Sequence, residues 1–180
     1  MKKSMMSIML GLALVCVVSF SGTVYAGTSQ DLNDVYLKSG DTYVKVDTDY
    51  SHPTIHGTLS GTSDSTDATK LDIHLLYKNF FNSQSCIENG DTVRISIADD
   101  VSGDYVYSLA GETPIVFYGK GMGSDMYYIN SDSTSCIDQT NQISFTEVDS
   151  FRFSDGPWSL YLNGDSFDVS NTNITQFVVE

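Results

Sequence analysis

Apolar and polar residues alternate along most of the chain. The alternation is clearest in five short segments: DTYVKV (41–46), TVRISI (92–97), WSLYL (158–162), SFDV (166–169) and ITQFVV (174–179). Strict alternation is typical of strands that bury one face, because successive side chains of a strand point to opposite sides. Such strands, separated by turn residues, favour antiparallel pairing. We therefore predict an all-β fold, an antiparallel β-sandwich or Greek key.

Two further segments test this prediction. Residues 70–81, KLDIHLLYKNFF, alternate as a strand through Leu71, Ile73 and Leu75, although the same segment also carries a helical stripe of apolar residues. We predict a strand. Residues 57–69, GTLSGTSDSTDAT, are rich in Ser, Thr, Gly and Asp, which predicts an exposed loop or a flexible connection.

A Gly-Asp pair preceded by Ser or Asn recurs along the chain. It occurs at residues 39–41, 89–91, 102–104 and 163–165. Glycine adopts the positive φ angles that tight turns require, and Asp is tolerated at the turn exit. We predict hairpin turns at these points. Calcium ligation by the Asp side chains is the alternative, although no loop has the dense acidic spacing of a dedicated calcium loop.

The first 26 residues have the pattern of a secretory signal peptide. Lys2 and Lys3 precede an apolar stretch, and small residues end it at Ala26. A signal peptide this short, with lysines at its start, indicates a bacterial protein that is secreted or periplasmic after cleavage. Only Cys86 and Cys136 then remain, and in an oxidising compartment they are expected to form one disulfide.

The remaining residues, 27–180, fit a single all-β domain, or a β-rich part at 27–112 followed by a second part at 113–180. The whole chain has a formal charge of −14, and removal of Lys2 and Lys3 leaves seven basic against 23 acidic residues, a charge of −16. Such an acidic protein repels phosphate backbones and anionic lipid headgroups. Nucleic acid is therefore excluded as a partner, whereas cations, basic proteins and neutral glycans remain candidates. The composition does not indicate an oligomeric state.

No catalytic motif is present, and we expect no organic cofactor. The strongest metal candidates are His52 and His56, four residues apart on either side of Pro53. Tyrosine and tryptophan combine an apolar ring with a polar group and suit binding surfaces. The predicted binding face consists of Tyr105, Tyr107, Tyr118, Tyr127, Tyr128, Trp158 and Tyr161.

The last third of the chain resembles a βγ-crystallin Greek-key domain. Two stretches, residues 115–129 and 148–167, resemble its two halves. The residues that carry the resemblance are Phe117 and Met122 in the first half, and Ser150, Gly156, Trp158, Tyr161 and Phe167 in the second. The resemblance implies Greek-key hairpins over residues 114–180. The calcium signature of that family is not matched, since it would fall on Phe145, Thr146, Asp149 and Ser150.

Three functions are compatible with these features. The first is an exported, non-catalytic binding or structural module that presents tyrosine-rich strands to a glycan or protein. The second is a secreted membrane-acting toxin, in which residues 57–69 and the adjoining strands rearrange into an inserted hairpin. The third is a small secreted hydrolase or protein inhibitor. The first is our leading prediction.

Overall fold

The computed structural model describes residues 31–100, 103–108, 112–118, 125–138, 141–148 and 157–180. The predicted signal peptide lies outside these residues. They form thirteen strands in one antiparallel sheet and contain no α-helix, which confirms the all-β prediction. Within this part of the chain, no helix is long and apolar enough to cross a membrane.

The strands vary in length from three to eight residues. They are β1 (Leu32–Val35), β2 (Leu37–Ser39), β3 (Thr42–Thr48), β4 (Ile55–Thr62), β5 (Leu71–Tyr77), β6 (Thr92–Ile97), β7 (Tyr105–Tyr107), β8 (Ile115–Phe117), β9 (Tyr127–Ser131), β10 (Gln142–Glu147), β11 (Ser159–Asn163), β12 (Ser166–Ser170) and β13 (Phe177–Val179). Strand β5 confirms the strand prediction for residues 70–81.

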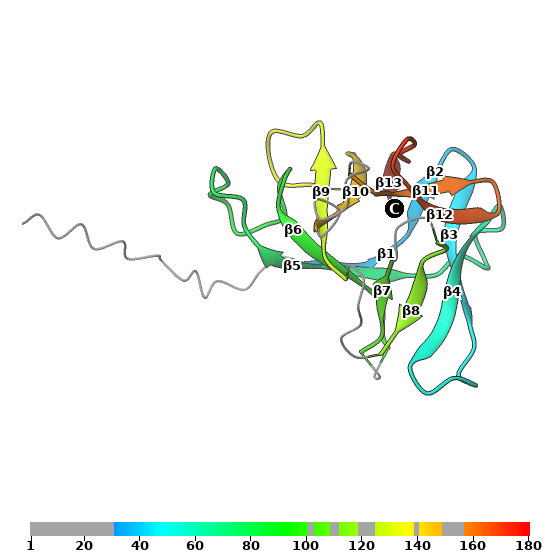
Figure 1. Ribbon diagram of the computed structural model, residues 1–180. Helices are drawn as coiled ribbons and strands as arrows, with labels where there is room; N and C mark the ends of the chain where they lie inside the picture. The colour runs from blue at the N-terminus through cyan, green and yellow to red at the C-terminus, as the bar shows by residue number, and fades with distance from the viewer. Residues whose placement is uncertain (1–30, 101–102, 109–111, 119–124, 139–140, 149–156) are drawn as a thin grey trace, which may run out of the picture.

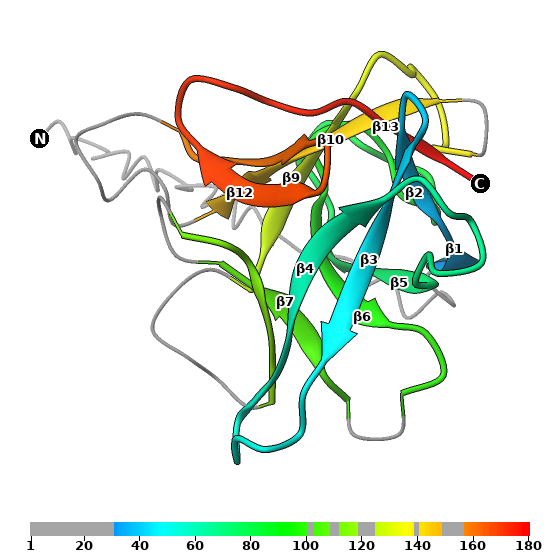
Figure 2. The same cartoon turned by 90° about the vertical axis from the view of Figure 1, so that its right-hand side faces the viewer.

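The sheet branches and closes on itself. Among the described residues, β4, β6 and β10 each pair with three neighbours, because two short strands share one edge of each. One ring of pairings runs β4-β3-β2-β13-β10-β11-β12, and a second runs β4-β8-β7-β6-β9-β10-β11-β12. The strands accordingly surround a common centre instead of forming one flat layer (Figures 1 and 2).

The interior is a single cluster of buried apolar side chains. It includes Leu37, Val44 and Ile73 from before residue 112, and Phe145 and Phe177 from after it, each at most 1% exposed. The alternation in the sequence predicted the inward positions of β3, β6, β11 and β12. The segments before and after residue 112 also pair directly, since β4 contacts both β8 and β12. They therefore share one core.

Strand β4 corrects the prediction of a loop at residues 57–69. It extends to Thr62, and its inward positions are Gly57, Leu59 and Gly61. A Cβ at position 61 would meet the backbone oxygen of Gly164, so only glycine fits where β4 passes the β11–β12 turn. Two of the three inward residues lack a side chain, and this hides the alternation in the sequence. Only the part after Thr62 lies outside a strand.

Two of the four Gly-Asp pairs form hairpin turns, as predicted. Gly40 and Gly164 each have a φ of 59° and occupy the first position of the two-residue connections β2–β3 and β11–β12. Glycine at this position is what a type II′ hairpin turn requires. Gly90 and Gly103 also have positive φ angles. The aspartates that follow them are buried, however, and have a second role described below.

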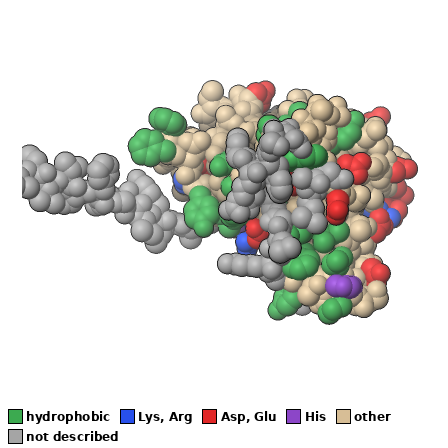
Figure 3. Space-filling view, in the orientation of Figure 1, with side chains coloured by type: hydrophobic (Ala, Val, Ile, Leu, Met, Phe, Trp, Pro, Cys, Tyr) green, Lys and Arg blue, Asp and Glu red, His purple; other side chains and the backbone are tan. Residues whose placement is uncertain are grey.

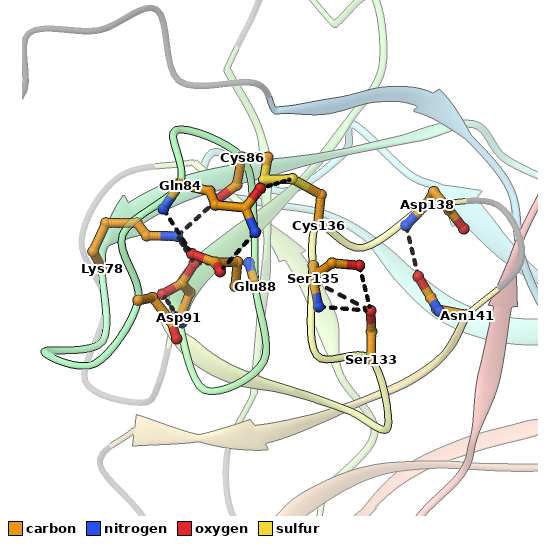
Figure 4. Close-up of a disulfide and its surroundings, with 11 residues drawn as sticks. Lys78, Gln84, Cys86, Glu88, Asp91, Ser133, Ser135, Cys136, Asp138 and Asn141 are labelled. Carbon is orange, nitrogen blue, oxygen red and sulfur yellow. Dashed lines mark hydrogen bonds and ion pairs between the residues drawn. A yellow bond between two sulfur atoms is a disulfide. The ribbon is translucent and has the colours of Figure 1, made fainter.

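The predicted disulfide between Cys86 and Cys136 is present, with the two Cα atoms 5.6 Å apart (Figure 4). It joins the β5–β6 connection to the loop after β9. The backbone N–H of Ile137 also donates to the carbonyl oxygen of Ile87, at 2.8 Å, so the two segments are connected by a hydrogen bond beside the disulfide. A disulfide is compatible with an oxidising extracellular or periplasmic compartment.

A lysine organises the β5–β6 connection beside the disulfide (Figure 4). The Lys78 ammonium donates to Glu88 Oε2 at 2.8 Å, to Asp91 Oδ2 at 2.6 Å and to the carbonyl oxygen of Cys86 at 2.8 Å. The Asp91 side chain is wholly buried and also accepts hydrogen bonds from Asn79 and Asn82. A buried charge is tolerated only when it is paired and hydrogen-bonded in this way.

The same network changes the acidity of Glu88. Burial acts to raise the pKa of Glu88, but hydrogen bonds from Lys78 and from the Gln84 backbone N–H outweigh it, so the pKa lies below its ordinary value of 4.5. A carboxylate with a lowered folded-state pKa stabilises the fold above its ordinary pKa. That stabilisation is lost as the pH falls through the lowered value.

We therefore predict a pH-dependent effect of Glu88→Gln on the free energy of unfolding. The variant should be less stable than the wild type at neutral pH, and the difference should shrink once the pH falls below 4.5. Urea unfolding between neutral and acidic pH measures it. Glu112→Gln, which removes the same charge at an exposed position, is the matched control. A difference between Glu88→Gln and wild type that stays constant across this range would contradict the assignment.

Candidate functional site

The Gly-Asp pair at residues 103–104 places a buried carboxylate at one end of the molecule. Asp104 lies just before β7, and its side chain has no exposed surface. Its Oδ2 atom lies 2.6 Å from Nδ1 of His56, the second residue of β4. The other oxygen, Oδ1, is buried and has no hydrogen-bond partner in the described part of the chain. The buried carboxylate thus fixes the orientation of the imidazole ring from the interior side.

Two exposed tyrosines contact the same histidine. The ring of Tyr50 lies 5.0 Å from that of His56, and the ring of Tyr118 lies 6.1 Å away, nearly parallel to it. Tyr50 and Tyr118 are 62% and 53% exposed, whereas the His56 side chain is only 14% exposed. We call Tyr50, His56, Tyr118 and Asp104 the aromatic cluster.

The aromatic cluster lies where three elements meet. Tyr50 belongs to the β3–β4 connection, His56 to β4, and Tyr118 directly follows β8. Register pairing of Ile55 with Phe117 holds β4 and β8 together at this point. Figure 3 shows a histidine side chain, in purple, beside hydrophobic side chains at the lower end of the molecule, where Figure 1 places the β3–β4 connection. The core strands therefore hold an exposed set of rings in place.

The groups of the aromatic cluster suit contact with a ligand. Exposed tyrosine faces provide apolar area with a hydroxyl at the edge, and the histidine contributes a polar edge between them. Convergent polar groups within an apolar surface are typical of small-ligand sites. The chemistry fits a ligand with an apolar face and many hydroxyl groups.

The two histidines of the metal prediction, His52 and His56, make different contacts. His52 Nδ1 accepts hydrogen bonds from the backbone N–H groups of Thr54 and Ile55, so its ring closes the turn before β4. His56 is held by Asp104 instead. Within the described ranges, no group of three or more His, Cys, Asp or Glu side chains lies close enough to hold a metal ion.

The seven aromatic residues of the predicted binding face do not lie on one surface. Tyr105, Tyr107 and Tyr127 are at most 6% exposed and belong to the interior. The other four are more exposed but lie on separate elements: Tyr118 after β8, Tyr128 on β9, and Trp158 and Tyr161 before and on β11. Strand β10 separates β9 from β11. Alternation identifies strands, but it does not say which face of a strand is outside when both carry aromatic residues.

One of the buried tyrosines belongs to a polar group inside the core. The Tyr127 hydroxyl lies 3.0 Å from Ser108 Oγ, which also donates to the buried carboxylate of Glu147. Burial raises the pKa of Tyr127 well above its ordinary value, so the phenol stays protonated and available as a hydrogen-bond donor. This group satisfies polar atoms in the interior and is not open to a ligand.

Sequence reasoning missed two members of the aromatic cluster. Tyr50 lies in a connection with no distinguishing pattern, and only the structure brings it to His56. In the sequence, Asp104 is recognisable only as the aspartate of a Gly-Asp pair that predicts a turn. Its burial could not be read from the sequence, because its partner is 48 residues away.

A second exposed apolar feature lies at the tip of the β5–β6 connection. Phe80 and Phe81 are 92% and 88% exposed, and their rings meet edge to face with centroids 5.4 Å apart. Tyr77, at the end of β5, is 66% exposed. Figure 3 shows hydrophobic side chains protruding on the left, where Figure 1 places this connection. We call Phe80 and Phe81 the phenylalanine tip.

Comparison with known proteins shows no relative: no family model, no curated protein and no solved structure matches the chain. The βγ-crystallin resemblance therefore stays a prediction. Of the residues that carry it, Trp158 directly precedes β11, Tyr161 lies on β11 and Phe167 on β12, while Met122, Ser150 and Gly156 lie outside the described residues.

Proposed function

We propose that the protein is an exported binding module that recognises a neutral glycan through the aromatic cluster. The observation that carries this proposal is the pair of exposed tyrosine rings that both contact a histidine held by a buried carboxylate. Sugar rings have apolar faces that pack on aromatic rings and hydroxyl groups that bond to polar edges.

Charge and size narrow the ligand class. The formal charge of −14 opposes binding of anionic polymers and favours neutral ones. A stable protein interface buries roughly 800 Å² on each partner, which is far more than a few exposed side chains supply. A glycan chain is therefore favoured over a protein as the ligand of the aromatic cluster. Export is supported by the signal-peptide pattern and is compatible with the disulfide.

The proposal predicts retention of the purified protein on at least one member of a panel of cellulose, chitin, xylan, mannan and starch. Tyr118→Ala and Tyr50→Ala should each weaken retention roughly tenfold, since loss of one stacked ring costs on the order of 1 kcal/mol. Affinity electrophoresis or isothermal titration measures the change. Tyr77→Ala removes a comparably exposed tyrosine at the end of β5, outside the aromatic cluster, and is the matched control.

Two outcomes would contradict the glycan proposal. One is the absence of binding to every polysaccharide of the panel. The other is binding that Tyr77→Ala weakens as much as Tyr118→Ala does, because the aromatic cluster would then not be the site.

A second candidate function, contact with membranes, is favoured by the phenylalanine tip. Two fully exposed phenylalanines on a loop are costly in water and suit insertion into the interfacial region of a bilayer. Two hydrogen bonds fix the backbone at the phenylalanine tip. The backbone N–H of Asn79 donates to the buried Asp91, and the backbone N–H of Phe81 donates to the Asn79 side chain. In this version of the toxin hypothesis the membrane-active segment is residues 80–81 and not 57–69.

The membrane candidate predicts co-sedimentation with vesicles of phosphatidylcholine, and weaker binding when an anionic lipid is added, because the protein is acidic. Replacing Phe80 and Phe81 together by Ser should abolish sedimentation, whereas Tyr50→Ser, at an exposed site elsewhere, should not. Release of an entrapped dye distinguishes pore formation from simple adhesion. Equal sedimentation of the double variant and the wild type would contradict a role of the phenylalanine tip.

A further inference from the structure

Three side chains, one on β5, one on β6 and one just before β1, form a continuous hydrogen-bonded chain. Ser96 Oγ lies 2.8 Å from Nε2 of His74, and Nδ1 of the same ring lies 3.1 Å from Oδ2 of Asp31. His74 is 22 positions from Ser96 and 43 positions from Asp31 in the sequence, so no local sequence motif predicts this contact. They are separate from the aromatic cluster and share no residue with it.

Strand register brings them together. Asp72 of β5 pairs with Ser96 of β6, and His74 pairs with Arg94, so Ser96 and His74 are diagonal neighbours on one face of the sheet. Asp31 directly precedes β1, which pairs with β5. Its second oxygen, Oδ1, accepts the backbone N–H of Leu75 at 2.9 Å. The carboxylate is therefore anchored to β5 and positions the histidine ring.

The geometry fixes the roles of the three groups. When Nδ1 carries the proton and donates it to Asp31, Nε2 presents a lone pair to the Ser96 hydroxyl. A serine hydroxyl bonded to a histidine, with the histidine oriented by a carboxylate, is the arrangement that activates a nucleophile. The His74 side chain is 37% exposed and that of Asp31 23%, so a substrate can reach the site.

A hollow of about 500 Å³ lies next to Ser96 and His74. Three carboxylates, Asp72, Asp99 and Asp100, also line it. Grouped acidic side chains attract a cation and repel an anionic substrate. A positive charge on the substrate would also offset the negative charge that develops on a carbonyl oxygen during attack.

We propose that Ser96, His74 and Asp31 hydrolyse carboxylic esters that carry a positive charge. Ser96 Oγ attacks the ester carbonyl while its proton passes to His74 Nε2. The bond to the alcohol oxygen then breaks, and the alcohol leaves with the proton from His74. Water, deprotonated by His74, cleaves the acyl group from Ser96 and restores the hydroxyl. Ser96 is the nucleophile, His74 the general base and acid, and Asp31 a positioning residue.

The first test is covalent labelling of the oxidised wild-type protein with a fluorophosphonate. The Ser96 oxygen should bond to phosphorus with loss of fluoride, and peptide mapping should find the label on Ser96. Ser60, another strand serine, donates to Asp47 but has no histidine contact in the described structure, so it is the internal control. Labelling of Ser96 no faster than of Ser60 would overturn the proposal without any variant.

The second test compares hydrolysis of acetylcholine, which is cationic, with that of 3,3-dimethylbutyl acetate, its neutral isostere with a similar alcohol leaving group. Ser96→Ala and His74→Ala should reduce turnover of both esters to the buffer rate, while Ser60→Ala should leave it unchanged. The proposal predicts a higher kcat/KM for the cationic ester relative to its uncatalysed hydrolysis. A preference for the neutral ester would overturn the charge assignment, and turnover unaffected by Ser96→Ala would overturn the whole proposal.

The role of Asp31 requires a separate readout. Asp31→Asn should lower kcat by 10²-fold or more with KM little changed, because the ring is no longer held in the productive tautomer. Asp31→Glu should restore part of the loss. Equal activity of Asp31→Asn and wild type would show that Asp31 does not position His74 for the reaction. Ser96 is not part of the aromatic cluster, so Ser96→Ala should lose esterase activity but still bind the polysaccharide. Failure of the esterase proposal can therefore be distinguished from failure of the glycan proposal.

Discussion

The division of one edge of β4 between β8 and β12 is the constraint on which the rest of the structure depends. The first half of that edge pairs with β8, the second half meets β12, and the opposite edge pairs with β3. Gly61 permits the close approach of the β11–β12 turn, because any side chain would occupy the space of the Gly164 backbone oxygen. Both rings of strands pass through β4, and they separate there into β3 on one edge and β8 on the other. His56, near its beginning, is held by the same pairing.

Two buried aspartates connect this framework to the surface features. Asp91 and Asp104 both follow a glycine with positive φ, and both lie wholly inside the protein. Each is hydrogen-bonded to a basic side chain: Asp91 to Lys78, at the start of the same β5–β6 connection, and Asp104 to His56, on β4. One aspartate supports the loop that exposes the phenylalanine tip, and the other supports the aromatic cluster. In this protein a turn motif thus also supplies anchors for the residues most exposed to a partner.

Much of the fold could be predicted from the sequence, and the physical reason is local. Alternation revealed the strands because each buries one face, glycine marked the turns because it adopts positive φ, and two cysteines in an export context implied one disulfide. Residues 57–62 of β4 were missed because Gly57 and Gly61 carry no side chain to show the pattern. Tertiary pairing could not be predicted at all.

The candidate sites were the least predictable part, because each depends on contacts across the chain. His56 was considered as a metal ligand, yet its partner Asp104 is a turn residue far away in the sequence. Tyr127 was assigned to a binding face, and the structure buries it completely. The contact between His74 and Ser96 follows from the register of β5 and β6, which alternation alone leaves open.

Native-state hydrogen exchange at two β4 amides is the most direct test of the central role of this strand. The N–H of Leu59 donates to Pro114, next to β8, and that of Gly61 donates to Asp165, in the β11–β12 turn. If β4 joins both rings into one cooperative core, the two amides should exchange with the same opening free energy, equal to that of global unfolding. Exchange of Gly61 through a markedly smaller opening would show that β11 and β12 separate independently, and would contradict this account.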